Sequence, residues 1–164
     1  MPERTAQTLE TLNLKFEPAN IADADTLITY ENTPGVTHPE TYAPLKSRDE
    51  AVKELKENTY FFIKDGDIVV GTASFRDWLE GGTYIGNLTV APSHRRRGVG
   101  RAAVIGIMEM NKKSESFTLF THPDNLPAQA LYKELGFTNE GLAKPPFPSS
   151  IDFVKMVKRV IPAV

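Results

Sequence analysis

A strand-to-helix junction rich in arginine and glycine constrains this chain more than any other stretch of its sequence. A strand-like run at 84–90 precedes it, and a helix-like run at 99–113 follows it. A helix N-terminus presents unpaired backbone N–H groups and the positive end of the helix dipole. Gly98 and Gly100 allow close approach to that backbone, and the neighbouring arginines add permanent positive charge. The junction therefore predicts a site for phosphate oxygens.

The other apolar patterns predict a single α+β domain of the mixed three-layer kind. Alternating residues predict strands at 12–16, 60–63, 68–75, 84–90, 117–120, 138–143 and 151–160, and Pro18 is expected to break the first pattern. Capping residues predict helices after Asn20 or Asp23, after Ser47 and after Asn125, in addition to the helix at 99–113. Residues 1–11 are expected to form a flexible arm, and residues 12–164 the domain.

The composition of the chain argues against binding to nucleic acid, metal ions or membranes. A net charge of −2 gives no overall attraction for nucleic acid, so the positive charge at the junction is local. The absence of cysteine excludes thiol chemistry, and the three histidines lack metal-ligand spacing, so no metal site is expected. No apolar run reaches the ~20 residues that span a bilayer, and the first residues do not resemble a signal peptide. We therefore expect a cytoplasmic protein that binds no membrane.

The glycines of the junction also fit the dinucleotide-binding pattern G-x-G-x-x-A, over residues 98–103. That pattern belongs at the start of a βαβ series. Here it follows a predicted antiparallel hairpin late in the chain. The context therefore argues against a dinucleotide-binding fold.

Two motifs, in order, resemble those of the GNAT superfamily, the acyl-CoA-dependent N-acyltransferases. Arg95-x-x-Gly98-x-Gly100 after a strand resembles the superfamily signature [Arg/Gln]-x-x-Gly-x-[Gly/Ala]. The second motif follows in the next predicted helix, where the family's spacing is matched by Asn125, Ala128, Leu131, Tyr132, Leu135, Gly136 and Phe137. The resemblance implies a central, mostly antiparallel sheet that splays into a V and is flanked by helices.

The resemblance also implies how acetyl-CoA is held as co-substrate. Backbone groups of Leu88 and Val90 would receive the pantetheine arm, and the Leu88 N–H would polarise the acyl carbonyl. Asn125 would contact the pantetheine, and Tyr132 would protonate the leaving thiolate. The pyrophosphate would lie on the junction, formed by Arg95, Arg96, Arg97, Gly98, Val99, Gly100 and Arg101. The implied activity is direct acetyl transfer to a primary amine of a small metabolite or of a protein or peptide amino end.

The general base and the acceptor stay open at the level of sequence. The base that deprotonates the amine is Glu31, Glu80, or a water chain that ends on Asn87 or Thr89. The acceptor is expected between residues 32–46 and 144–150, which together with their flanks contribute Glu31, His38, Glu40, Tyr42, Pro44 and Phe147.

One departure from the family pattern keeps a second function open. Many relatives place a glutamate near the start of the strand before the junction, where this chain has Gly81 and Gly82. A non-catalytic acyl-CoA-binding module is therefore the alternative to an N-acetyltransferase. The expected partners are acetyl-CoA and an amine acceptor, with a homodimer as a possible assembly.

Overall fold

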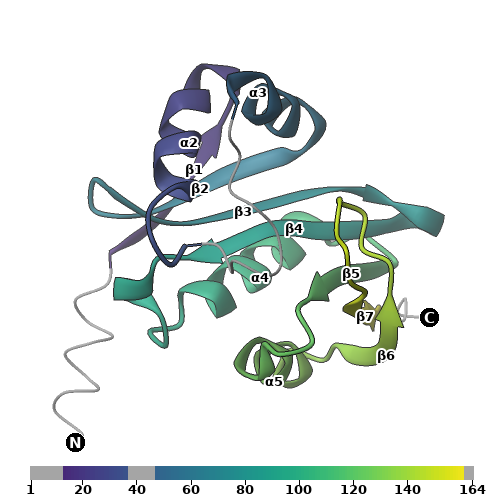
Figure 1. Ribbon diagram of the computed structural model, residues 1–164. Coiled ribbons are helices and arrows are strands. Elements are labelled where there is room, and N and C mark those ends of the chain that lie inside the picture. The colour runs from purple at the N-terminus through teal and green to yellow at the C-terminus, as the bar shows by residue number, and fades with distance from the viewer. Residues whose placement is uncertain (1–12, 37–46, 161–164) are drawn as a thin grey trace, which may run out of the picture.

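The computed structural model describes residues 13–36 and 47–160 of the chain and shows one seven-stranded sheet (Figure 1). The strands follow the order β1-β2-β3-β4-β5-β7-β6, and all neighbours are antiparallel except β4 and β5. The strands are β1 (Leu14–Ala19), β2 (Thr59–Asp65), β3 (Ile68–Trp78), β4 (Gly82–Val90), β5 (Ser116–Thr121), β6 (Thr138–Ala143) and β7 (Phe153–Arg159). The predicted element order and α+β class are confirmed.

Helices cover both faces of the sheet, which makes three layers (Figure 1). The α-helices are α2 (Ala24–Glu31), α3 (Arg48–Glu57), α4 (Val99–Met110) and α5 (Leu126–Glu134). The first two pack on β2 around the buried residues Leu27, Leu55 and Phe62. The last two pack on the opposite face, where apolar side chains such as Ile107 and Ile85 form the larger core. The sheet thus lies between two apolar layers.

The two central strands diverge. Parallel pairing between β4 and β5 is limited to Thr83 with Phe117 and Tyr84 with Thr118. Beyond Tyr84 the rest of β4 pairs with β3 alone, so its other edge faces a gap. The expected V-shaped splay is confirmed, and it lies directly before the arginine-glycine junction.

Local capping agrees with the sequence at several helix ends. The Asn20 side chain accepts a hydrogen bond from the Ala22 N–H at 2.9 Å, and the Asp23 carboxylate accepts one from the Asn20 N–H at 2.9 Å. Ser47 caps α3 by accepting from the Glu50 N–H at 3.0 Å. Asn125 caps α5 by accepting from the Ala128 N–H at 3.2 Å. These local bonds explain why the starts of the helices were predictable.

Several of the predicted helix and strand ends were wrong. Strand β1 continues through Pro18, which pairs with Phe61, because β1 is an edge strand and proline's missing N–H can face outward there. Helix α4 stops at Met110, and the Asn111 side chain donates to the Ile107 carbonyl at 2.8 Å and closes it. Strand β7 begins at Phe153 rather than at residue 151. Strands β3 and β4 are longer at their shared turn than the pattern indicated.

Some expectations lie outside the described residues. These are the flexible arm at 1–11 and the acceptor candidates His38, Glu40, Tyr42 and Pro44.

Candidate active site

The gap between β4 and β5 is the mouth of a cleft of about 1430 Å³. Strand β4 forms one wall, and the end of β5 with α5 forms the other. The junction and the start of α4 close one end, while α3 lines the opposite part. Of the site residues expected from the sequence, those that line the cleft are Leu88, Val90, Arg95, Arg96, Gly98, Val99, Gly100, Arg101, Asn125 and Tyr132.

The junction presents open backbone to this cleft. Gly98 is the N-cap of α4 and has a φ of 85°, and Arg96 has a φ of 62°. A Cβ placed on Gly98 would meet no atom within 4 Å in the described part of the chain, its two chain neighbours aside. Left-handed residues beside a helix start turn successive N–H groups toward one concavity, which suits phosphate oxygens. The geometry therefore fits the pyrophosphate of the expected coenzyme A.

The four arginines have different surroundings. Arg95 Nε donates to the Val90 carbonyl at 3.1 Å, and its terminal nitrogen donates to the Gly35 carbonyl. Arg101 pairs with Glu134 at 3.1 Å. Arg97 does not line the cleft, and its charge acts on Asp65. Arg96 is exposed and lines the cleft. The three consecutive arginines therefore differ: Arg95 lines the cleft and is bonded to two backbone carbonyls, Arg96 lines the cleft and is exposed, and Arg97 is not part of the cleft lining.

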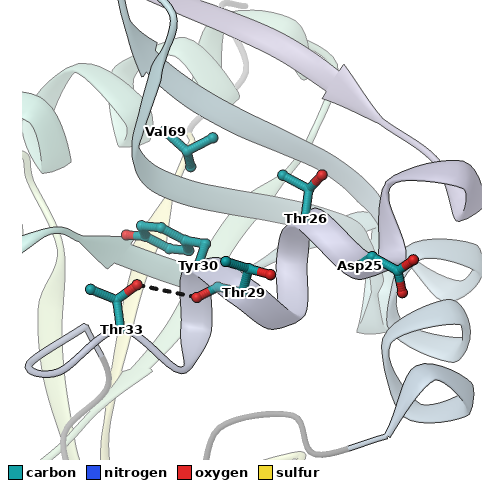
Figure 2. Close-up of a pocket in the computed structure, with 6 residues that line it drawn as sticks. All are labelled: Asp25, Thr26, Thr29, Tyr30, Thr33 and Val69. Carbon is teal, nitrogen blue, oxygen red and sulfur yellow. Dashed lines mark hydrogen bonds between the residues drawn. The ribbon is translucent and has the colours of Figure 1, made fainter.

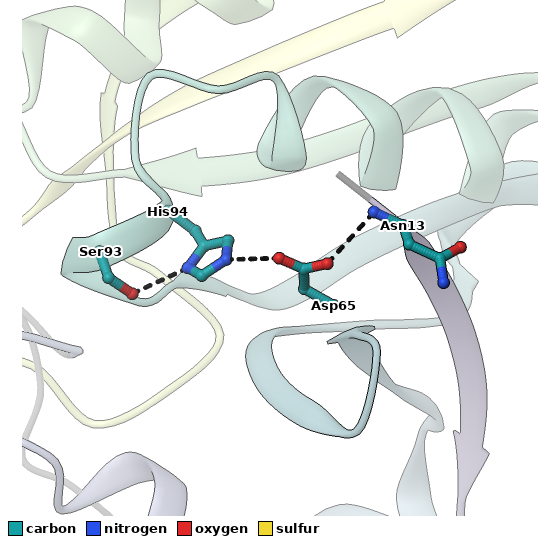
Figure 3. A network of polar contacts seen from close by, with 4 residues as sticks. All are labelled: Asn13, Asp65, Ser93 and His94. Atoms are coloured by element: carbon teal, nitrogen blue, oxygen red, sulfur yellow. Dashed lines mark hydrogen bonds and ion pairs between the residues drawn. The ribbon is translucent and has the colours of Figure 1, made fainter. Parts of the chain in front are cut away.

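A short polar network holds the junction to the β2–β3 turn (Figure 3). His94 Nε2 contacts Asp65 Oδ2 at 2.9 Å, and a carboxylate only accepts, so this nitrogen is the donor. The Asn13 N–H donates to the same carboxylate at 3.1 Å, and the Ser93 hydroxyl contacts His94 Nδ1 at 2.8 Å. The hydrogen bond from His94, then that from Asn13, lowers the pKa of Asp65 below its ordinary value. The network therefore holds His94, which directly precedes the arginines of the junction, against the end of β2.

Tyr132 lies on the α5 wall of the cleft with only 8% of its surface exposed. Its ring packs against Phe137, with 6.1 Å between ring centroids. Burial raises the pKa of the Tyr132 hydroxyl well above its ordinary value, so the group stays protonated. No hydrogen bond joins this hydroxyl to any residue in 13–36 or 47–160. A buried phenol that faces a cleft without a protein partner suits a ligand acceptor atom.

Helix α3 contributes acidic side chains to the lining of the cleft. Glu50, Glu54 and Glu57 line it from one face of α3, at the spacing of successive helical turns. These residues were not predicted as site residues, because exposed acids at this spacing usually form an ordinary solvated helix face.

Aromatic rings also line the cleft, and most of them were not predicted from the sequence. The Tyr84 ring lines the cleft and packs against Trp78 outside the cleft lining, with 5.0 Å between the ring centres. The Arg76 guanidinium lies 5.2 Å from the Tyr84 ring centre. Phe147, which was expected near the acceptor, also lines the cleft and packs on Phe153 at 5.0 Å. These rings offer apolar surface near the acidic wall.

Two base candidates from the sequence occupy different places. Glu31 lines the cleft, is 2% exposed, and receives a hydrogen bond from the Tyr60 hydroxyl at 3.4 Å. Glu80 lies in the turn between β3 and β4 and is not part of the cleft lining. Asn87 and Thr89 both line the cleft.

A second, shallow depression of about 390 Å³ lies on α2 (Figure 2). Its lining includes Thr26, Thr29 and Thr33, and the Thr33 hydroxyl is already bonded to the Thr29 carbonyl at 3.1 Å. Tyr30 stands between this depression and the cleft, since its hydroxyl contacts the Thr89 hydroxyl at 2.9 Å. Burial raises the pKa of Tyr30 to about 12, although the bond to Thr89 opposes the rise. The depression adds no chemistry to the cleft.

Paired variants separate the two roles within the arginine triplet. Arg96→Ala is expected to weaken coenzyme A binding about threefold and to reduce its dependence on salt, because an exposed charge is screened by ions. Arg95→Ala should instead lower the thermal unfolding temperature, since the Val90 and Gly35 carbonyls lose their donor. Calorimetric titration at two salt concentrations and thermal unfolding of both variants test this. The interpretation is wrong if both variants change the same quantity.

Two absences hold for the part of the chain that the structure describes. No helix within it is long and apolar enough to cross a membrane. Within the same residues, no three His, Asp or Glu side chains are grouped so that they could hold a metal ion.

Comparison with known proteins agrees with the geometry. The family described as Acetyltransferase (GNAT) family matches residues 25–137. The ribosomal-protein-S18-alanine N-acetyltransferase from Escherichia coli is similar in structure, with a TM-score of 0.72 and 18% identity, over 93% of this chain and 97% of that one. No curated protein sequence matches the chain.

Two further solved structures share the fold. A chimeric spermidine N-acetyltransferase from Vibrio cholerae has a TM-score of 0.72 and 17% identity, over 89% of this chain and 95% of that one. A Salmonella typhimurium protein described as a putative acetyltransferase with acetyl-CoA has a TM-score of 0.70 and 16% identity, over 93% and 96%. With the family match extending across the splayed strands, the junction and α5, the chain belongs to the Acetyltransferase (GNAT) family.

Proposed function

We propose that this protein transfers the acetyl group of acetyl-CoA to a primary amine by direct attack. The observation that carries the proposal is the buried tyrosine Tyr132, which lines the cleft between the splayed strands. Its raised pKa keeps it protonated, so it can donate a proton but not remove one. A proton donor at this place suits a reaction that releases a thiolate.

The residues proposed to bind acetyl-CoA lie at the junction and on the two walls of the cleft. Backbone N–H groups from Arg96 to Arg101 bind the pyrophosphate, assisted by the start of α4. Leu88 and Val90 on the unpaired edge of β4 receive the pantetheine, and the Leu88 N–H polarises the acyl carbonyl. The side-chain oxygen of Asn125 caps α5 by accepting from the Ala128 N–H, and its side-chain NH2 group is left to contact the pantetheine.

The bonds and protons balance without a covalent enzyme intermediate. The amine nitrogen forms a C–N bond at the acyl carbon as the C–S bond breaks. Tyr132 gives its proton to the departing sulfur and regains one from solvent. Glu31 is the proposed base for the proton that the amine loses, because it is the carboxylate among the sequence candidates that lines the cleft. An amine with a pKa near ~10 needs such a base before it can attack.

The acidic face of α3 favours a cationic acceptor. Glu50, Glu54 and Glu57 line the cleft beside the aromatic rings of Tyr84 and Phe147. Negative charge along a cleft raises the local concentration of cations. Two structural neighbours carry names that place their acetyl group on an alanine of a ribosomal protein and on spermidine. Both acceptors are amines, so a panel of candidate acceptors should include a polyamine and a peptide with a free amino end.

The test is release of coenzyme A from acetyl-CoA across a panel of amines. The panel holds polyamines, small primary amines and peptides with a free amino end, each paired with its N-acetylated form as control. Turnover with a free amine and not with its blocked form supports the proposal. Tight binding of acetyl-CoA with no turnover across the panel would favour the non-catalytic acyl-CoA-binding module.

Removing one charge from the acidic face tests the acceptor side. Glu57→Gln is expected to raise KM for a cationic amine about threefold with kcat little changed, the effect of one exposed charge. Glu109→Gln is the matched control, because Glu109 lies exposed on α4 outside the cleft lining. Equal KM values for the two variants would show that α3 does not face the bound amine. The measurement is steady-state kinetics at low salt, where such charges act most strongly.

A further inference from the structure

Strand β4 contains a bulge beside the proposed acyl site. Thr72 of β3 lies opposite Thr89, and Ser74 lies opposite Gly86, so Asn87 and Leu88 together face a single residue of β3. Asn87 has a φ of 50°, in the left-handed region. Asparagine tolerates this region better than other residues with a Cβ. A bulge re-aims the backbone that follows it, and here that backbone is Leu88.

Three hydrogen bonds fix the conformation of Asn87. Its carbonyl accepts from the Thr72 hydroxyl at 2.7 Å. Its side-chain Nδ2 donates to Ser74 Oγ at 2.9 Å and to Glu54 Oε2 at 3.1 Å. The first two partners belong to the neighbouring strand, and Glu54 belongs to α3. One amide side chain therefore joins the bulge to the acidic wall of the cleft.

A chain of buried hydroxyls supports the same bulge. The Thr72 proton is committed to the Asn87 carbonyl, so the Thr89 hydroxyl at 2.7 Å must donate to Thr72. The Tyr30 hydroxyl, 2.9 Å from Thr89, must then donate to Thr89. Hydrogen bonds in such a chain polarise one another. The Asn87 carbonyl before Leu88 and the Thr89 hydroxyl after it are thus both held by Thr72 of β3, and Thr89 is also held by Tyr30 of α2.

We propose that Asn87 is a positioning residue, which holds the left-handed bulge so that the Leu88 N–H points at the acyl carbonyl. This inference rests on the proposed function, in which Leu88 stabilises the developing oxyanion. Such a donor acts only when it lies about 2.7–3.1 Å from the oxyanion, so a small turn of the peptide weakens it. Asn87 also joins this donor to Glu54, so strand β4 and the acidic face of α3 are coupled through one side chain.

A pair of substitutions tests the coupling by exchanging donor and acceptor. Asn87→Asp places a carboxylate against Glu54 and should lower kcat about fivefold, with acetyl-CoA affinity nearly unchanged. Adding Glu54→Gln restores the bond, because the glutamine amide donates to the aspartate, and kcat should return toward the Glu54→Gln value. Asn87→Ala should lower kcat by a similar factor without rescue by Glu54→Gln. Asn58→Ala is the control, since Asn58 also donates to Glu54 Oε2 at 3.1 Å but lies outside the bulge.

A second readout needs no acceptor amine. In NMR titrations, the Leu88 amide proton of the wild-type protein should move further downfield with acetyl-CoA than with coenzyme A, because only the former offers a carbonyl. This difference should shrink in Asn87→Ala and in Asn87→Asp, and return in Asn87→Asp with Glu54→Gln.

The outcomes separate this inference from the proposed function. If the Leu88 response depends on Asn87 while no amine is turned over, the positioning role stands and amine acetylation fails. If amines are acetylated but kcat and the Leu88 response are the same in wild type and Asn87→Ala, the positioning role is overturned. Failure of Glu54→Gln to rescue Asn87→Asp would likewise remove the link to α3.

Discussion

Replacing Tyr132 by phenylalanine is expected to lower kcat with the best amine about 100-fold, the low end of general acid catalysis. The substitution keeps the ring that packs on Phe137 and removes only the hydroxyl. That hydroxyl is held protonated by burial and has no partner in the described part of the chain. Its loss therefore removes an interaction made mainly in the transition state. Steady-state kinetics with acetyl-CoA and the best amine measure the effect.

Two comparisons control for packing. Thermal stability and acetyl-CoA affinity of Tyr132→Phe should remain close to those of the wild-type protein, so that kcat alone falls. Tyr132→Ala should in addition lower the free energy of unfolding by about 3 kcal/mol, because it empties a buried ring site. If the phenylalanine variant turns over at the wild-type rate, Tyr132 is a core residue and water protonates the thiolate.

Replacing Gly98 by valine is expected to weaken acetyl-CoA binding at least ~10-fold, or about 1.4 kcal/mol. A Cβ at Gly98 meets no atom of the other described residues within 4 Å, its two chain neighbours aside, so the new side chain would extend into the space proposed for the phosphate. The φ of 85° also disfavours a β-branched residue. Calorimetric titration with acetyl-CoA measures the change.

Gly141→Val is the matched control for backbone strain. Gly141 has a φ of 92° and equally open surroundings, but it lies on β6 away from the cleft lining. Both variants should lose similar stability, and only Gly98→Val should lose affinity. If the two folded variants bind acetyl-CoA with equal affinity, the junction does not bind the pyrophosphate.

The features that were predictable from sequence depend on neighbours along the chain. The junction was identifiable because Arg95, Gly98 and Gly100 follow one another at a strand-to-helix boundary. The helix cap at Asn125 is equally local. For the same reason the order of elements and the family resemblance were correct, and the family match now confirms the latter.

The features that were missed depend on contacts across the fold. The bulge at Asn87 exists only as a mismatch between β3 and β4, which the pattern of β4 alone does not reveal. The direction of each arginine depends on the left-handed turn at Arg96, so three identical residues could not be told apart. Strand β1 passes through Pro18 because it has a neighbour on one side only. The acidic face of α3 became meaningful when the structure placed it on the cleft.

The most direct test of the whole account is a rapid-quench experiment with isotopically labelled acetyl-CoA and the best amine, followed by mass spectrometry of every product. Direct transfer predicts that the label appears on the amine nitrogen at the rate at which coenzyme A is released, with no labelled protein at any time. Label on the protein before it reaches the amine, or label found only in free acetate, would contradict transfer to an amine in this cleft.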